Sequence, residues 1–240
     1  MERLVRVAWG PRQESVEAVA GRWKQTLDGL AALLPDAGSG TETNGLWTWQ
    51  HVHVSGPATE LRPDGEALLT ALRAEQEADG WSDRTGYGLA LVIEGKPGWK
   101  IDITSRAGGS PEFLLQTMGI RITSPDEVAT PDAELLTALV EAWDPDYGGA
   151  FDDDLLDALE DDAGFVVGEP SVGWIGHLSA RRAALVPDDL PAARRELPGG
   201  GVVLGIAPQD DTEAVVQAYV RLRDAGALAP LPRPMDRPHL

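Results

Sequence analysis

Residues 88–104 read GLALVIEGKPGWKIDIT, two apolar runs separated by Gly95-Lys96-Pro97-Gly98. The runs Gly88–Glu94 and Trp99–Thr104 have the length and the β-rich composition of strands. Two such runs joined by a few residues rich in glycine and proline are typical of a β-hairpin. Because a hairpin places its strands antiparallel, this stretch favours an α+β fold over the strand-helix-strand repeat of a parallel α/β sheet.

Strand and helix patterns are interspersed along the rest of the chain. Val5, Val7 and Trp9 share one face of a predicted strand from Arg3 to Trp9, and apolar residues recur every three or four positions from Glu14 to Leu34, as in a helix. Further strands are predicted at Leu46–Val54, Ile120–Thr123, Val172–Leu178 and Gly201–Ile206. Further helices are predicted from Asp64 to Gly80, from Thr130-Pro131 to Trp143, and from an Asp210 cap to Gly226. We therefore expect a single domain over residues 1–240, with a mixed, largely antiparallel sheet packed with about four helices.

The charge balance limits the partners that the chain can bind. Lys and Arg total 20 against 39 Asp and Glu, so the formal net charge is −19. A surface this negative repels nucleic-acid phosphates and anionic membranes, and we expect neither as a partner. A basic protein is a better partner, because complementary potentials accelerate encounter. The alternative is that the charge serves solubility alone.

The chain contains no cysteine, which excludes disulfides, thiolate nucleophiles and sulfur-ligated metals. The first residues, Met1 to Arg6, are a short charged strand pattern rather than a signal sequence, and no later apolar run approaches membrane length. We expect a cytoplasmic protein.

Residues that could carry catalysis or bind a cofactor form no complete constellation. Trp47, Trp49, His51 and His53 occupy every second position of one predicted strand, so all four side chains project from the same face. Two histidines on one strand face are a geometry that a zinc site can use. A zinc site needs a third ligand, however, and the sequence offers no obvious one. We therefore expect no metal or cofactor, with the histidines packed beside the tryptophans or facing solvent. A metal-dependent hydrolase that uses His51 and His53 stays open as an alternative.

Nucleophilic catalysis and phosphate binding have still weaker support. Ser171 and Ser179 flank His177, yet the Gly-x-Ser-x-Gly elbow of serine hydrolases is absent. The glycine run at 199–201 precedes a predicted strand, whereas phosphate-binding glycines follow a strand and open a helix. We expect the chain not to be an enzyme.

The steepest concentration of charge lies between Asp144 and Asp162, where no Lys or Arg occurs. If the second half of this segment is helical, Phe151, Leu155 and Leu159 share its inner face. Its carboxylates then form an outward ridge that could occupy the cationic groove of a nuclease in place of phosphates. The alternative is a solvated run of charge. The candidate partner-binding residues are Asp152, Asp153, Asp154, Asp157, Glu160, Asp161 and Asp162.

Three short motifs follow one another along the chain, and a Gly-Ala-Leu-Ala-Pro stretch at 226–230 comes after the last predicted helix. The motif residues are Trp9, Gly10, Pro11 and Arg12 with Glu14, then Trp143 and Pro145 within Trp-Asp-Pro-Asp, then Gly173 and Trp174. In order and spacing they resemble the immunity protein 52 family of bacterial polymorphic toxin systems. His177 stands where that pattern leads us to expect an aromatic residue.

This resemblance implies a single-domain α+β protein that binds and neutralises a cognate toxin, often a nuclease related to restriction endonucleases. The expected partner is therefore a basic, nuclease-like toxin domain. The acidic segment from Phe151 to Asp162 is not part of the family pattern, and its charge leads us to expect a partner-specific contact surface there. A general acidic mimic of nucleic acid, which would inhibit several nucleases, is a further alternative.

Overall fold

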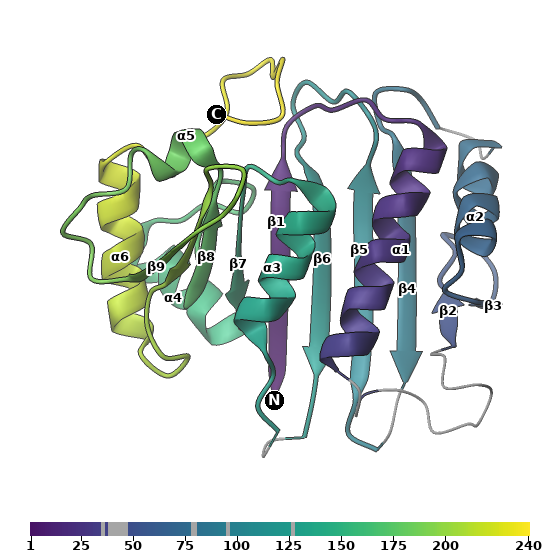
Figure 1. Ribbon diagram of the computed structural model, residues 1–240, viewed down its shortest axis with the longest axis horizontal. Coiled ribbons are helices and arrows are strands. Elements are labelled where there is room, and N and C mark those ends of the chain that lie inside the picture. The colour runs from purple at the N-terminus through teal and green to yellow at the C-terminus, as the bar shows by residue number, and fades with distance from the viewer. Residues whose placement is uncertain (35–36, 38–47, 78–80, 95–96, 126–127) are drawn as a thin grey trace.

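The computed structural model describes residues 1–34, 37, 48–77, 81–94, 97–125 and 128–240, which fold around one large antiparallel sheet (Figure 1). In the described residues the sheet has ten strands in the order β3-β2-β4-β5-β6-β1-β7-β8-β10-β9, and every pair of neighbours is antiparallel. The strands are β1 (Glu2–Trp9), β2 (Trp49–His51), β3 (Thr59–Leu61), β4 (Tyr87–Glu94), β5 (Lys100–Ala107), β6 (Gln116–Thr123), β7 (Tyr147–Phe151), β8 (Ile175–Leu178), β9 (Ala193–Glu196) and β10 (Val202–Gly205).

Helices cover the two faces of the sheet unequally. Figure 1 shows α1, α2 and α3 side by side over one face. On the opposite face, α4 and α6 pack against each other at the β7-β8-β10 end, and β4, β5 and β6 are left open there. The helices are α1 (Val16–Leu33), α2 (Gly65–Glu77), α3 (Asp132–Trp143), α4 (Asp153–Ala163), α5 (Ala180–Ala183) and α6 (Thr212–Asp224). None of these helices is long and apolar enough to cross a membrane.

The α+β class and the 88–104 hairpin are confirmed, but two finer expectations are wrong. The sheet is antiparallel at every described pair rather than mixed, and the described residues form six helices rather than about four. The additional helices are α4, which the sequence suggested only conditionally, and the single turn α5. The strands β3, β7 and β9 also escaped prediction.

Several predicted boundaries shift because the caps fall on other residues. Asp211, not Asp210, caps α6 and accepts from the Ala214 amide, since a turn from Pro208 to Asp211 delays the helix by one residue. Pro131 is the N-cap of α3 rather than its first residue. The hydroxyl of Thr130 donates to Asp132 instead of capping the helix.

Two predicted strands are shorter than expected. In the described part of the Leu46–Val54 segment, residues 48–54, the strand covers Trp49–His51, so His53 lies beyond it. Trp47 lies outside the described residues. The Val172–Leu178 segment pairs only from Ile175 onward.

Tryptophans join the first strand to α1 and α3. The Trp9 and Trp143 rings stack at 5.5 Å, and Trp23 meets Trp143 edge-on at 6.3 Å. The Trp143 indole also donates to Thr26 Oγ1 at 2.8 Å. Offset and edge-on pairs of buried aromatic rings contribute beyond the area they bury, so this cluster anchors both helices to the sheet.

Glycines allow the unpredicted strand β7 to lie against its neighbours. A Cβ atom on Gly148 would come within 2.7 Å of the Arg6 carbonyl oxygen on β1. A Cβ on Gly173 would lie 1.6 Å from the Ala150 oxygen of β7, so any larger residue at 173 would force the backbone to move. Gly173 is therefore required by packing.

Candidate functional site

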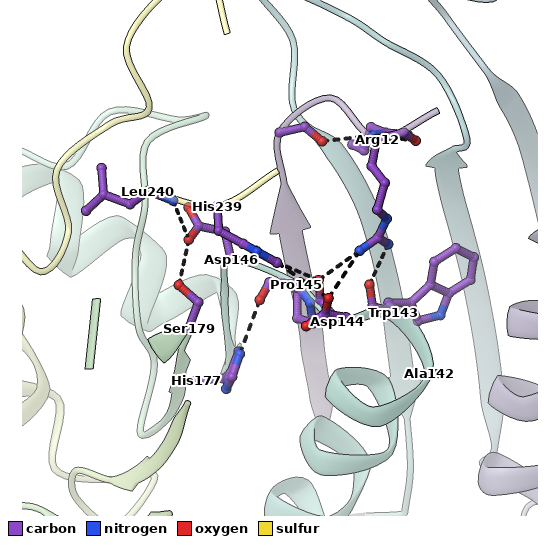
Figure 2. A network of polar contacts seen from close by, with 12 residues as sticks. Arg12, Ala142, Trp143, Asp144, Pro145, Asp146, His177, Ser179, His239 and Leu240 are labelled. Atoms are coloured by element: carbon purple, nitrogen blue, oxygen red, sulfur yellow. Dashed lines mark hydrogen bonds and ion pairs between the residues drawn. The ribbon is translucent and has the colours of Figure 1, made fainter. Parts of the chain in front are cut away.

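The motif residues at the end of β1 bind the C-terminal end of α3 (Figure 2). Arg12 donates to the carbonyl oxygens of Trp143 at 2.5 Å and Asp144 at 3.0 Å, and its guanidinium lies over the Trp9 ring. Glu14 pairs with both Arg12 and Arg22, and Arg22 donates to the Ala142 oxygen. These cations satisfy carbonyls that the helix leaves unpaired, so Arg12 has a structural role.

The other motif residues also stabilise the fold. A Cβ on Gly10 would lie 2.2 Å from the Arg237 oxygen, and Pro11 is half-buried. The Pro145 oxygen accepts from His177, and the Trp174 indole donates to Asp132 at 3.0 Å. The motifs thus lie at packing positions, and none of their side chains forms a reactive pair.

Sequence reasoning missed a buried ion pair beside this cluster. Arg182 Nη2 lies 2.7 Å from Asp146 Oδ2, and both side chains are fully buried. Asp146 also accepts from the Ser179 hydroxyl and the Leu240 amide, and Arg182 donates to two carbonyl oxygens after α6. The pair joins β7, α5 and the last residues of the chain.

A cleft of about 610 Å³ opens next to this pair, between the α3 end and the segment from 237 to 240. His177 lies in its wall, and burial lowers the pKa of this histidine to about 4. Ser179 also lines the cleft, but its hydroxyl donates to Asp146 rather than to His177 (Figure 2). The cleft therefore lacks the hydroxyl-to-imidazole hydrogen bond of an activated serine.

The predicted acidic ridge is present on α4. Leu155 and Leu159 are buried, as expected, and Asp152 is the N-cap, which accepts from the Leu155 amide and from Gln209. Asp152 is thus half-buried, and its carboxylate has a structural role as the cap of α4. Asp153 lies 3.4 Å from Arg121. We define the acidic ridge as the five remaining residues, Asp154, Asp157, Glu160, Asp161 and Asp162, all exposed and with no side-chain partner among the described residues.

Exposed apolar residues follow the acidic ridge directly. Gly164 ends α4 in a left-handed conformation and Phe165 turns back into the core against Tyr219. Val166 and Val167 are then 58% and 73% exposed. Exposed apolar side chains therefore border the carboxylate surface of α4.

The histidine pair gains a third potential ligand that the sequence did not reveal. His51 is buried at the end of β2, and its ring centroid lies 4.1 Å from that of His53. Burial and the neighbouring charge of His53 lower the pKa of His51. Glu75 of α2 approaches them, so that one ligand atom from each of the three residues lies within 4.8 Å of the others. Only the helix packing on the sheet, not the spacing in the sequence, brings this carboxylate to the pair.

The comparison with solved structures gives a match in fold. The chain aligns with the Pseudomonas aeruginosa T6SS protein PA0821 over 95% of its own length and 76% of the other chain, with a TM-score of 0.53 and 14% sequence identity. No family model matches the sequence, and a search of curated proteins finds no match either. The likeness to PA0821 is one of fold.

Proposed function

We propose that this chain is an immunity protein that binds a bacterial toxin domain directly, neutralises it and catalyses no reaction itself. The shared fold with a T6SS protein supports a role in bacterial competition. The motif resemblance to the immunity protein 52 family supports the same role. The observation that carries the proposal is the acidic ridge.

Carboxylates of the acidic ridge in the second half of α4 lower the stability of the free protein. Glu160, Asp161 and Asp162 lie at the negative end of the α4 dipole, where each carboxylate costs about 0.3–1 kcal/mol, and the last turn contains no basic residue. Asp157 and Asp161 are like charges four positions apart on one face, which adds to the cost. Lys and Arg side chains of a partner relieve this repulsion when they pair with the ridge. The proposed partner is therefore a basic toxin domain, and a nuclease groove that binds phosphates has the required charge.

The proposed contact surface combines electrostatic steering of the partner with burial of apolar side chains. The acidic ridge accelerates encounter with a basic domain over a distance of about 8–10 Å, beyond which salt screens it. Val166 and Val167 then supply apolar area that is removed from water in the complex. Association is expected to slow steeply as salt rises, and dissociation is expected to change less.

The direct test is co-expression with the toxin domain encoded beside this chain in a sensitive bacterial host. Rescue of growth and co-purification of a salt-sensitive complex are expected. The variant D157N/E160Q/D161N should lower the association rate at low salt at least tenfold. The control D83N/E134Q/D210N removes the same charge from exposed positions off the ridge and should stay within about twofold of the unchanged chain.

Other outcomes separate the alternatives. If the two triple variants lower the association rate equally, the net charge of the chain and not the acidic ridge accelerates binding. Inhibition of several unrelated nucleases would favour a general nucleic-acid mimic. Absence of both rescue and complex would overturn the proposal and favour a metal-dependent hydrolase that uses His51 and His53.

A further inference from the structure

The geometry at the β2 edge of the sheet points to a metal site that is independent of the acidic ridge. We propose that His51, His53 and Glu75 bind one divalent transition-metal ion, Zn²⁺ by preference, and thereby fasten β2 to α2. Two imidazoles and one carboxylate are a ligand set that zinc sites use, with a fourth position left for water. The three residues come from the end of β2, the segment after it and the last turn of α2.

The distances suit a zinc ion after small rotations of the side chains. One ligand atom from each of the three residues lies within 4.8 Å of the others. An ion at about 2.0–2.2 Å from each tetrahedral ligand requires these atoms to be about 3.3–3.6 Å apart. The backbone positions are therefore compatible with binding, and side-chain rotation, chiefly of Glu75, can close the remaining gap.

His53 already has the supporting hydrogen bond that a ligating histidine needs. Its Nε2 atom lies 2.8 Å from Thr59 Oγ1 on the neighbouring strand β3. Ligating histidines generally keep their second ring nitrogen bonded in this way, which fixes the tautomer and the ring orientation. The Nδ1 atom of His53 is then the one that binds the ion.

The local charge favours a cation and leaves Glu75 without a counter-charge. Glu75 lies at the negative end of α2, whose last turn has no basic residue, and its carboxylate has no ion-pair partner among the residues that the structure describes. The surrounding cavity of about 640 Å³ is lined by three further carboxylates, Glu60, Asp64 and Glu66. Arg62 is the one Lys or Arg among the described residues that line it, and it is paired with Asp64.

Imidazole ligands distinguish this site from the acidic ridge and from adventitious binding to carboxylates. Nitrogen donors favour Zn²⁺, Cu²⁺ and Ni²⁺, whereas carboxylates alone favour Mg²⁺ and Ca²⁺. An excess of Mg²⁺ should therefore compete for the exposed carboxylates and not for His51, His53 and Glu75. Because the site exists only when α2 packs on the sheet, the bound ion should also stabilise the folded chain.

The test uses the tag-free chain, treated with a chelator and titrated with Zn²⁺ in the presence of millimolar Mg²⁺. Calorimetry should give one ion per chain, thermal unfolding should shift to a higher temperature with Zn²⁺, and Co²⁺ should produce the visible absorption of a tetrahedral site. Glu75→Gln should weaken Zn²⁺ binding more than tenfold, and Thr59→Val by about 10- to 100-fold.

Glu77→Gln is the matched control, because Glu77 is an exposed carboxylate at the end of the same helix. It should leave Zn²⁺ affinity within twofold, and the unfolding temperatures of both glutamine variants without metal should agree. Lack of saturable one-to-one binding, or equal loss in the two variants, overturns the site. Toxin binding has a separate readout, so failure here leaves the proposed immunity function unaffected.

Discussion

Removing the carboxylate of Asp146 should destabilise the fold far more than removing a comparable carboxylate at the surface. Asp146 and Arg182 pair at 2.7 Å with both side chains fully buried. Asp146→Ala leaves the guanidinium buried without a counter-charge, and it also removes the acceptor for Ser179 and for the Leu240 amide. Breaking a buried pair in this way costs about 3–5 kcal/mol.

The surface pair of Arg221 and Asp189 provides the matched control. It has the same 2.7 Å separation, but the Asp189 side chain is 82% exposed. Exposed ion pairs contribute about 0–1 kcal/mol to the free energy of unfolding, so Asp189→Ala should change that free energy little. At about 2–4 °C per kcal/mol for a chain of this size, Asp146→Ala should lower the midpoint of thermal unfolding by about 6–20 °C.

Urea unfolding followed by tryptophan fluorescence measures both free energies, and calorimetry measures the midpoints. The double variant D146A/R182A should be more stable than the sum of the two single losses predicts, since it no longer buries an unpaired charge. The reasoning is refuted if Asp146→Ala and Asp189→Ala cost the same, or if the two buried substitutions are additive.

Three further predictions concern a buried histidine, a glycine and a helix cap. His177 is buried with its pKa at about 4 against 6.5 when unfolded, so below pH 6.5 the unfolded chain takes up a proton that the folded chain does not. Stability should therefore fall by about 3 kcal/mol between pH 6.5 and pH 4, and urea unfolding of His177→Gln across this range should lack most of that loss. Gly173→Ala should cost about 3 kcal/mol because its Cβ would meet a backbone oxygen at 1.6 Å, whereas Gly199→Ala, with open space around it, should be nearly neutral in the same assay. Asp152→Ala should cost about 1 kcal/mol through loss of the α4 cap, and circular dichroism should show less helix; a variant as stable as the unchanged chain would contradict the capping role.

Sequence patterns predicted the elements that alternate or recur clearly. The 88–104 hairpin, the first strand and the first helix were found because each buries one regular set of side chains. Strand β7 has two glycines among five residues, and strand β9, Ala193–Glu196, is exposed at every position. Neither presents an apolar alternation, so pairing with neighbours, rather than local pattern, determines that they are strands.

Of the candidate sites, the one that lies within a single element was predicted, and those formed between distant elements were not. The acidic ridge was predictable because helical periodicity separates its carboxylates from Leu155 and Leu159 within a single element. The Asp146–Arg182 pair and the approach of Glu75 to the histidines depend on contacts between distant elements. No spacing in the sequence carries that information, and so neither was predicted.

The motif residues hold the fold together, whereas the acidic ridge lies exposed on α4. Arg12, Gly173 and Trp174 bind helix ends and allow close backbone packing, so a resemblance based on them speaks to the fold. The ridge side chains have no partner among the described residues, and Glu160, Asp161 and Asp162 at the negative end of α4 lower the stability of the fold through unpaired charge. A side-chain set that the fold does not need is free to vary with the partner. Under the proposed function, exchanging Asp157, Glu160, Asp161 and Asp162 should therefore change which toxin domain is bound while leaving the free energy of unfolding the same or higher, and a variant that loses the fold instead would place these residues in the framework.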